Sequence, residues 1–72
     1  MKLSNEQFLV LADAFCNSVQ DGTTAGILAC QVCEQLIHEC DERFATDNLE
    51  VEELRQLHYQ GKRLEQALNF LQ

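Results

Sequence analysis

The chain has 72 residues, 46% of them hydrophobic, with no proline, three glycines and a net charge of −7. This length corresponds to one domain, residues 1–72, and the composition favours a helical fold over disorder. The negative charge disfavours DNA, RNA and anionic membranes as partners, since each presents phosphate groups, whereas it suits a basic protein surface.

No apolar run reaches the roughly 18 residues that a membrane-spanning helix needs. The first residues do not form a signal peptide, because polar residues interrupt them and no apolar segment follows before Asp13. We therefore expect a cytoplasmic protein without membrane partners, in which the four cysteines are reduced.

The first predicted helix covers residues 5–20. Ser4 and Gln7 match a capping box, in which two side chains accept hydrogen bonds from backbone N–H groups at the start of a helix. Leu3 and Phe8 occupy the two positions of a hydrophobic staple. Apolar residues then recur at helical spacing, and Gly22 is expected to supply the left-handed turn that ends the helix.

The second predicted helix covers residues 23–44, with Asp21 or Thr23 as its cap. Its apolar residues follow the alternating three- and four-residue steps of a seam that packs against another helix. Gly61 of the next helix is expected opposite Val32, where small residues permit close packing. The seam positions are Gly26, Cys30, Cys33, Ile37, Cys40 and Phe44.

The third predicted helix covers residues 48–71 and starts with Asp47 and Glu50 as a second capping box. Three helices with short connections predict an all-α fold, a small antiparallel three-helix bundle. The bend between the two longer helices should extend roughly 9–12 Å beyond the first helix. That would leave less cover over Cys40, Phe44, Leu49 and Val51. The seam of the third helix is Leu54, Leu57, Gly61, Leu64, Leu68 and Leu71.

Acidic residues concentrate around this bend. Between residues 39 and 53, seven of the twelve acidic residues are opposed by Arg43 alone, so this window carries −6 of the total charge. Glu39, Asp41 and Glu42 are at the end of a helix, where the helix dipole makes each acid cost about 0.3–1 kcal/mol. Their presence indicates either a surface for a basic partner or a solvated end that keeps the protein soluble. The predicted partner-binding residues are Glu39, Asp41, Glu42, Phe44, Asp47, Glu50, Glu52 and Glu53.

The cysteines permit other interpretations. Cys30 and Cys33 have the spacing of a redox or zinc motif, and Cys16 or His58 could supply further ligands. However, the pair lies inside a helix, where the dipole does not activate a thiol, and Cys40 is two turns from Cys33, too far to share a metal. Cysteine at a seam position packs as a small hydrophobic residue. We expect four reduced, mostly buried thiols, with no metal and no cofactor.

Catalytic patterns are weak. His58 and Cys33 could form a nucleophile–base pair across two helices, but they also fit a packed thiol beside a half-exposed histidine. The sequence has no phosphate-binding glycine loop and no H-E-x-x-H motif. A three-helix core of this size leaves little room for a substrate pocket. The sequence therefore predicts a protein that is not an enzyme.

The favoured interpretation is a small acidic interaction module or inhibitor that presents the bend to a basic protein, with Phe44 as an apolar anchor. It could block a nucleic-acid-binding site, and in size and charge it compares with small acidic regulators of phages and mobile elements. The alternatives are a metal- or thiol-handling protein using Cys30 and Cys33, or a structural dimerisation subunit. We also expect a homodimer, with candidate contacts at Val32, Leu36, Ala67 and Phe70.

Overall fold

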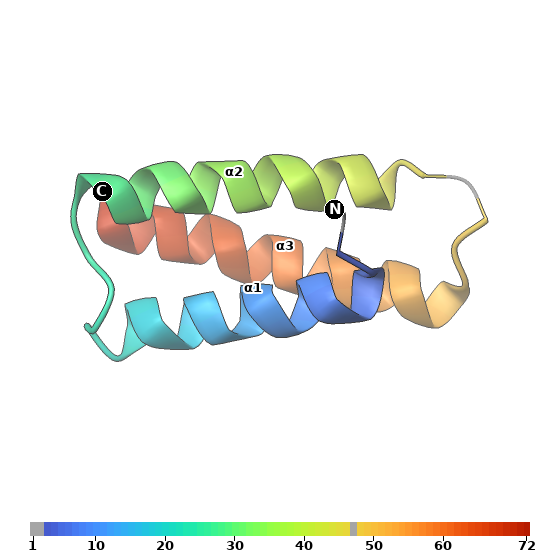
Figure 1. The fold of residues 1–72 in the computed structure, drawn as a ribbon, viewed down its shortest axis with the longest axis horizontal. Helices are drawn as coiled ribbons and strands as arrows, with labels where there is room; N and C mark the ends of the chain where they lie inside the picture. Colours follow the sequence, from blue (N-terminus) through green and yellow to red (C-terminus); the bar gives the residue numbers. More distant parts are fainter. Residues whose placement is uncertain (1–2, 47) are drawn as a thin grey trace.

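The computed structural model describes residues 3–46 and 48–72. These residues form three helices, α1 (Asn5–Gln20), α2 (Ile27–Phe44) and α3 (Val51–Leu71), and no strand within the described ranges. Successive helices run antiparallel, and the molecule measures 36 × 22 × 17 Å (Figure 1). The predicted three-helix bundle is confirmed. Within the described ranges, each helix falls short of the length or hydrophobicity required to cross a membrane.

α1 begins and ends at the predicted residues. The Gln7 N–H donates to Ser4 Oγ at 3.1 Å and the Ser4 N–H donates to Gln7 Oε1 at 3.0 Å, which completes the capping box. Gly22 has a φ of +79°, and its N–H donates to the Val19 carbonyl at 3.1 Å. This glycine therefore ends α1 in the left-handed conformation that the sequence predicts.

α2 begins at Ile27 rather than at residue 23, so the predicted start is wrong. Gly26 is the N-cap residue and has a φ of +98°, a conformation that a residue with a Cβ rarely adopts. The predicted caps act on α1 instead, because Asp21 is its C-cap residue and Thr23 Oγ1 donates to the Ser18 carbonyl at 3.1 Å. Gly26 therefore directs the chain into α2 and is not a seam position within it.

α3 begins at Val51 rather than at residue 48. Asn48 has a φ of +72°, and Glu50 is the N-cap residue without a side-chain hydrogen bond, so Glu50 does not complete the predicted capping box. Asp47 lies outside the described residues. The longer connection also shifts the register between α2 and α3. A Cβ added to Gly61 would lie 3.5 Å from Cys40 Sγ. Gly61 therefore packs near Cys40, and its predicted position opposite Val32 is wrong.

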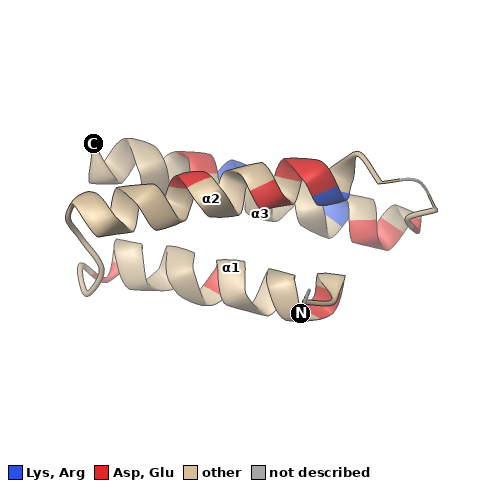
Figure 2. Cartoon of the chain, turned by 45° about the horizontal axis from the view of Figure 1, so that its top comes forward, with Lys and Arg blue, Asp and Glu red and all other residues tan. Residues whose placement is uncertain are grey.

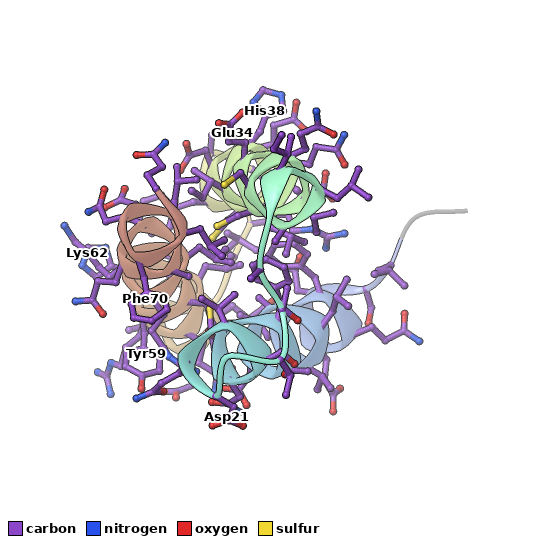
Figure 3. All side chains as sticks on the ribbon, turned by 90° about the vertical axis from the view of Figure 1, so that its left-hand side faces the viewer. Asp21, Glu34, His38, Tyr59, Lys62 and Phe70 are labelled. Carbon is purple, nitrogen blue, oxygen red and sulfur yellow. The ribbon has the colours of Figure 1, made fainter. Side chains whose placement is uncertain are left out.

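The core lies along α3, which packs against both other helices, whereas α1 and α2 make few direct contacts. Viewed end-on, the helices form the corners of a triangle and the sulfur atoms point between them (Figure 3). The largest fully buried side chains are Phe8, Val19, Cys33, Leu57 and Leu64. Ala12, Cys16, Leu36, Cys40 and Ala67 complete the core cluster.

The connection between α2 and α3 extends past the start of α1, as predicted (Figure 1). Phe44 and Val51 are 45% and 72% exposed there. Cys40, in contrast, is buried and Leu49 packs partly against the core, so these two are covered despite the overhang. The extended end therefore exposes two of its four apolar side chains.

The four candidate dimer contacts do not form one surface. Leu36 and Ala67 belong to the core. Val32 lines a groove between α1 and α2, whereas Phe70 lines another between α1 and α3. Figure 3 shows Phe70 on α3, away from α2. The four candidate residues therefore do not form one continuous contact surface.

Candidate functional site

The exposed end formed by α2 and α3 combines carboxylates with apolar side chains. Asp41, Glu42, Glu50 and Glu52 are exposed there. Figure 2 shows most of the acidic residues of α2 and α3 in the half of the bundle nearer this end, whereas Glu34 and Glu65 lie farther along these helices. Together with the exposed Phe44 and Val51, these four acids are called the acidic tip below.

A buried arginine lies beneath the acidic tip. Arg43 is 5% exposed and continues the buried stripe of α2 after Cys33, Leu36 and Cys40, at steps of three and four residues. Its guanidinium group lies over the Phe8 ring, with 4.8 Å between the guanidinium carbon and the ring centroid. The sequence analysis counted Arg43 only as the basic charge that opposes the acids, although the periodicity of α2 places it on the core side.

Arg43 joins the start of α1 to the end of α2. Its Nη1 donates to Asn5 Oδ1 and its Nη2 to the Leu3 carbonyl, both at 2.7 Å, while Nε donates to Glu39 Oε1 at 2.9 Å. Asn5 Nδ2 in turn donates to Glu53 Oε2 at 2.9 Å, which brings the first turn of α3 into the same network. The network connects all three helices at the base of the acidic tip.

Two of the predicted partner-binding acids are thus engaged within the molecule. Glu39 and Glu53 are half-buried, and each accepts a hydrogen bond from the Arg43–Asn5 network. The unfavourable dipole contact expected for Glu39 is offset by its ion pair with Arg43, at 2.9 Å. We therefore assign Glu39 and Glu53 to the base of the acidic tip.

The four acids of the acidic tip are more available for contact with another molecule. His38 Nε2 lies 3.0 Å from Glu42 Oε1, and Arg55 Nη1 lies 3.7 Å from Glu52 Oε2, but all four side chains are more than half exposed. Exposed pairs of this kind contribute little and exchange readily. Asp41 and Glu50 form no ion pair with any described residue.

The antiparallel arrangement brings one further acid, Glu6, to this end. A groove of about 580 Å³ between α1 and α3 is lined by Glu6, Asp13 and Glu53, among other residues. Glu6 is in the first turn of α1, next to the network at the base of the acidic tip. The sequence window from 39 to 53 did not include Glu6, because only helix pairing places the start of α1 beside the start of α3.

A second polar cluster joins α1 to α3 away from the acidic tip. Arg63 Nη1 donates to Asp13 Oδ1, and Nη2 donates to Asn17 Oδ1 at 2.9 Å. Gln60 Nε2 also donates to Asp13 Oδ1, at 3.4 Å. Asp13 thereby neutralises one of the few basic side chains of α3, so this cluster serves the packing of α1 on α3.

The cysteines are free and mostly buried. Cys33 Sγ and Cys40 Sγ donate to the carbonyls of Leu64 and Leu57, each at 3.2 Å. Burial raises the pKa of Cys33 to about 11, and it also raises the pKa values of Cys16 and Cys40. A raised pKa keeps a thiol protonated, which disfavours nucleophilic attack and metal coordination.

The alternative in which Cys33 and His58 form a nucleophile–base pair is not supported by their positions. The Cys33 thiol contacts the Leu64 carbonyl, whereas the His58 ring lies beside Phe44, with 6.3 Å between the ring centroids. Among residues 3–46 and 48–72, no three His, Cys, Asp or Glu side chains are grouped so that they could hold a metal ion.

Comparisons of the chain with protein-family models, curated proteins and solved structures found no match.

Proposed function

We propose that the protein is a small interaction module that presents the acidic tip to a basic surface of another protein. The observation that carries this proposal is the exposure of Phe44 and Val51 at the same end of the molecule as four exposed carboxylates. An apolar centre with a charged rim is the usual composition of a protein interface.

The two kinds of side chain would contribute differently. Asp41 and Glu50, which have no ion-pair partner among the described residues, would attract a positively charged surface and increase the rate of encounter. Phe44 is 45% exposed and would lose its remaining water contact in a pocket of the partner, which slows dissociation.

The Arg43 network would hold the acidic tip in its binding shape. Leu3, Asn5, Glu39 and Glu53 connect the end of α2 to both other helices. Because less conformational freedom is then lost on binding, more of the contact energy is available for affinity. A basic groove that binds nucleic acid is one surface to which such an acidic end is complementary, so the module could act as an inhibitor of nucleic-acid binding.

The test is affinity capture from an extract of the native cell on immobilised protein, followed by mass spectrometry. A true partner is retained by the wild type and lost from the variant Asp41→Asn, Glu42→Gln, Phe44→Ala. The control variant Asp21→Asn, Glu34→Gln removes the same number of charges from exposed positions outside the acidic tip, and it should retain the partner. Equal capture by both variants would contradict the proposal.

The inhibitory role has its own test. Duplex DNA or RNA is added to the captured complex at constant salt concentration. Release of the partner into solution would support competition for one basic groove. A complex that resists saturating nucleic acid would restrict the proposal to binding without inhibition.

A further inference from the structure

The side of the bundle opposite α3 is open. α1 and α2 both pack on α3 but make few contacts with each other, and a groove of about 460 Å³ lies between them. Leu11 from α1 and Val32 from α2 line this groove and are 46% and 43% exposed, while Phe8 and Leu36 form its buried part. The groove is therefore apolar where these four residues line it, and Leu3, Gln35, Glu39 and Arg43 complete its lining.

Helical spacing extends this apolar surface beyond the groove. Leu28 lies one turn before Val32 on α2 and is 75% exposed. Phe15 lies one turn after Leu11 on α1 and packs partly against the core. Residues four positions apart lie on the same side of a helix, so the surface follows most of the length of α1. It is called the α1–α2 face below.

The α1–α2 face is nearly free of charge in a chain of net charge −7. The charged residues that line the groove, within the described ranges, are Glu39 and Arg43, and these form an ion pair with each other. The first seven residues of α2, from Ile27 to Cys33, contain no charged residue, and this part of the ribbon is tan in Figure 2. A basic partner would find no unpaired carboxylate there.

We propose that a second copy of this chain covers the α1–α2 face, so that α1 and α2 of both chains pack as a four-helix arrangement around a two-fold axis. The same neutral, apolar surface on both partners suits an isologous interface, because a two-fold axis brings each patch onto itself. It is also where two strongly acidic molecules can meet without bringing their unpaired carboxylates together.

The size of the face agrees with this occupant. α1 has 16 residues, so two adjacent helices about 24 Å long and about 10 Å wide present roughly 500 Å². Two copies would bury on the order of 1,000 Å², the lower limit for a specific interface. The dimer should therefore be in equilibrium with the monomer in the micromolar range. It would bury the exposed leucine and valine side chains that a small domain cannot cover alone.

The dimer and the proposed tip complex should respond to salt in opposite directions. Added salt screens the repulsion between two chains of charge −7 and therefore favours the dimer. The same salt weakens attraction between the acidic tip and a basic partner. This difference separates the two proposals experimentally.

The test is sedimentation equilibrium of the wild type from low to high micromolar concentration, at low and high salt. We expect a monomer–dimer equilibrium whose dimer fraction rises with salt. Leu28→Glu and Val32→Glu should each raise the dimer dissociation constant by about tenfold or more, because each brings two carboxylates into an apolar contact. The matched control is Phe70→Glu, at a residue that is 71% exposed in the groove between α1 and α3, and it should leave the dissociation constant unchanged.

Leu28 is 75% exposed, so Leu28→Glu separates loss of the dimer from loss of the fold, and far-ultraviolet circular dichroism checks that its helices remain. A wild type that remains monomeric at high micromolar concentration and high salt would overturn the proposal. A dimer that Phe70→Glu dissociates and Leu28→Glu does not would also overturn it, and it would place the interface on α3.

Discussion

The Arg43 guanidinium group has acceptors from three parts of the chain: a backbone carbonyl before α1, an amide oxygen in its first turn, and a carboxylate one turn back on α2. Arg43 is 5% exposed, and removal of its side chain would leave the half-buried Asn5 and Glu39 without their charged partner. Loss of one partner from a buried ionic cluster costs more than the cluster itself contributes.

Arg43→Ala should therefore lower the free energy of unfolding by roughly 3 kcal/mol, as measured by urea denaturation. The control is Arg55→Ala, because the Arg55–Glu52 pair is exposed and 3.7 Å long. Its effect should stay within about 0.5 kcal/mol. Similar effects of both changes would show that the Arg43 network does not stabilise the bundle.

The buried thiols predict a loss of stability in alkaline solution. Burial raises the pKa of Cys33 from 9.0 to about 11, so the unfolded chain releases this proton at a lower pH than the folded chain. The contribution of Cys33 is present below pH 9 and is lost as the pH rises toward about 11. Urea denaturation at a series of pH values should show this decline, to which Cys33 contributes on the order of 2 kcal/mol.

Cys33→Ala provides the comparison for the alkaline decline. At neutral pH the variant should be less stable by roughly 1 kcal/mol, because a small core side chain is truncated. Between pH 9 and about 11 its stability should fall less steeply than that of the wild type. Parallel curves for the two proteins would exclude Cys33 as a source of the pH dependence.

At the level of the helices, the contact between α2 and α3 repeats every seven residues. Cys33 and Cys40 are seven apart, and so are Leu64 and Leu57, the residues whose carbonyls accept from the two thiols. Gly61 lies between these two contacts, near Cys40. This repeat shows that small seam residues let the backbone of α3 approach α2 closely.

Gly61 in the seam of α3 and Gly26 at the N-cap of α2 should respond oppositely to alanine. An alanine Cβ at Gly61 would lie 3.5 Å from Cys40 Sγ, an ordinary contact, so Gly61→Ala should stabilise the protein by about 0.5–1 kcal/mol through helix propensity. Gly26→Ala should destabilise it by roughly 1–2 kcal/mol, because Gly26 has a φ of +98°. Thermal unfolding of both variants measures the two changes in stability. Changes in the same direction would contradict the different roles assigned to Gly26 and Gly61.

For the whole molecule, the acidic tip and the α1–α2 face are separate surfaces with different chemistry. The acidic tip carries exposed carboxylates around the end of the bundle, and the α1–α2 face carries apolar side chains along its length. A dimer formed through the α1–α2 face could leave both tips free. One molecule could then bind two partners, or two sites of one partner, with increased avidity.

Once a tip partner has been captured, its binding kinetics should separate charge from apolar contact. Asp41→Asn with Glu42→Gln should lower the association rate several-fold at low salt, and the difference should disappear at high salt. Phe44→Ala should leave association unchanged and raise the dissociation rate about tenfold or more. Surface plasmon resonance at two salt concentrations measures both rates. An association rate that is insensitive to salt would exclude electrostatic steering by the acidic tip.

The sequence by itself determined the number of helices, the bounds of α1 and the ends of α2 and α3, because these signals are local. The capping box of Ser4 and Gln7, the left-handed Gly22 and the apolar steps of three and four residues all act between residues that are close along the chain. The same holds for the concentration of acids around the bend and for the apolar stripe that contains the buried Cys33 and Cys40.

Only the tertiary structure decided how these parts combine. Arg43 is buried and joins α1 to α2, because Leu3 and Asn5 meet the end of α2 across the bundle. Glu39 accepts a hydrogen bond from Arg43, and Glu53 accepts one from Asn5. The open α1–α2 face likewise exists because both helices pack on α3 and hardly on each other. Such contacts depend on helix register and on the path of each connection, which the left-handed Gly26 and Asn48 set. A local pattern shows which side of a helix is apolar, but it does not specify which other helix covers that side.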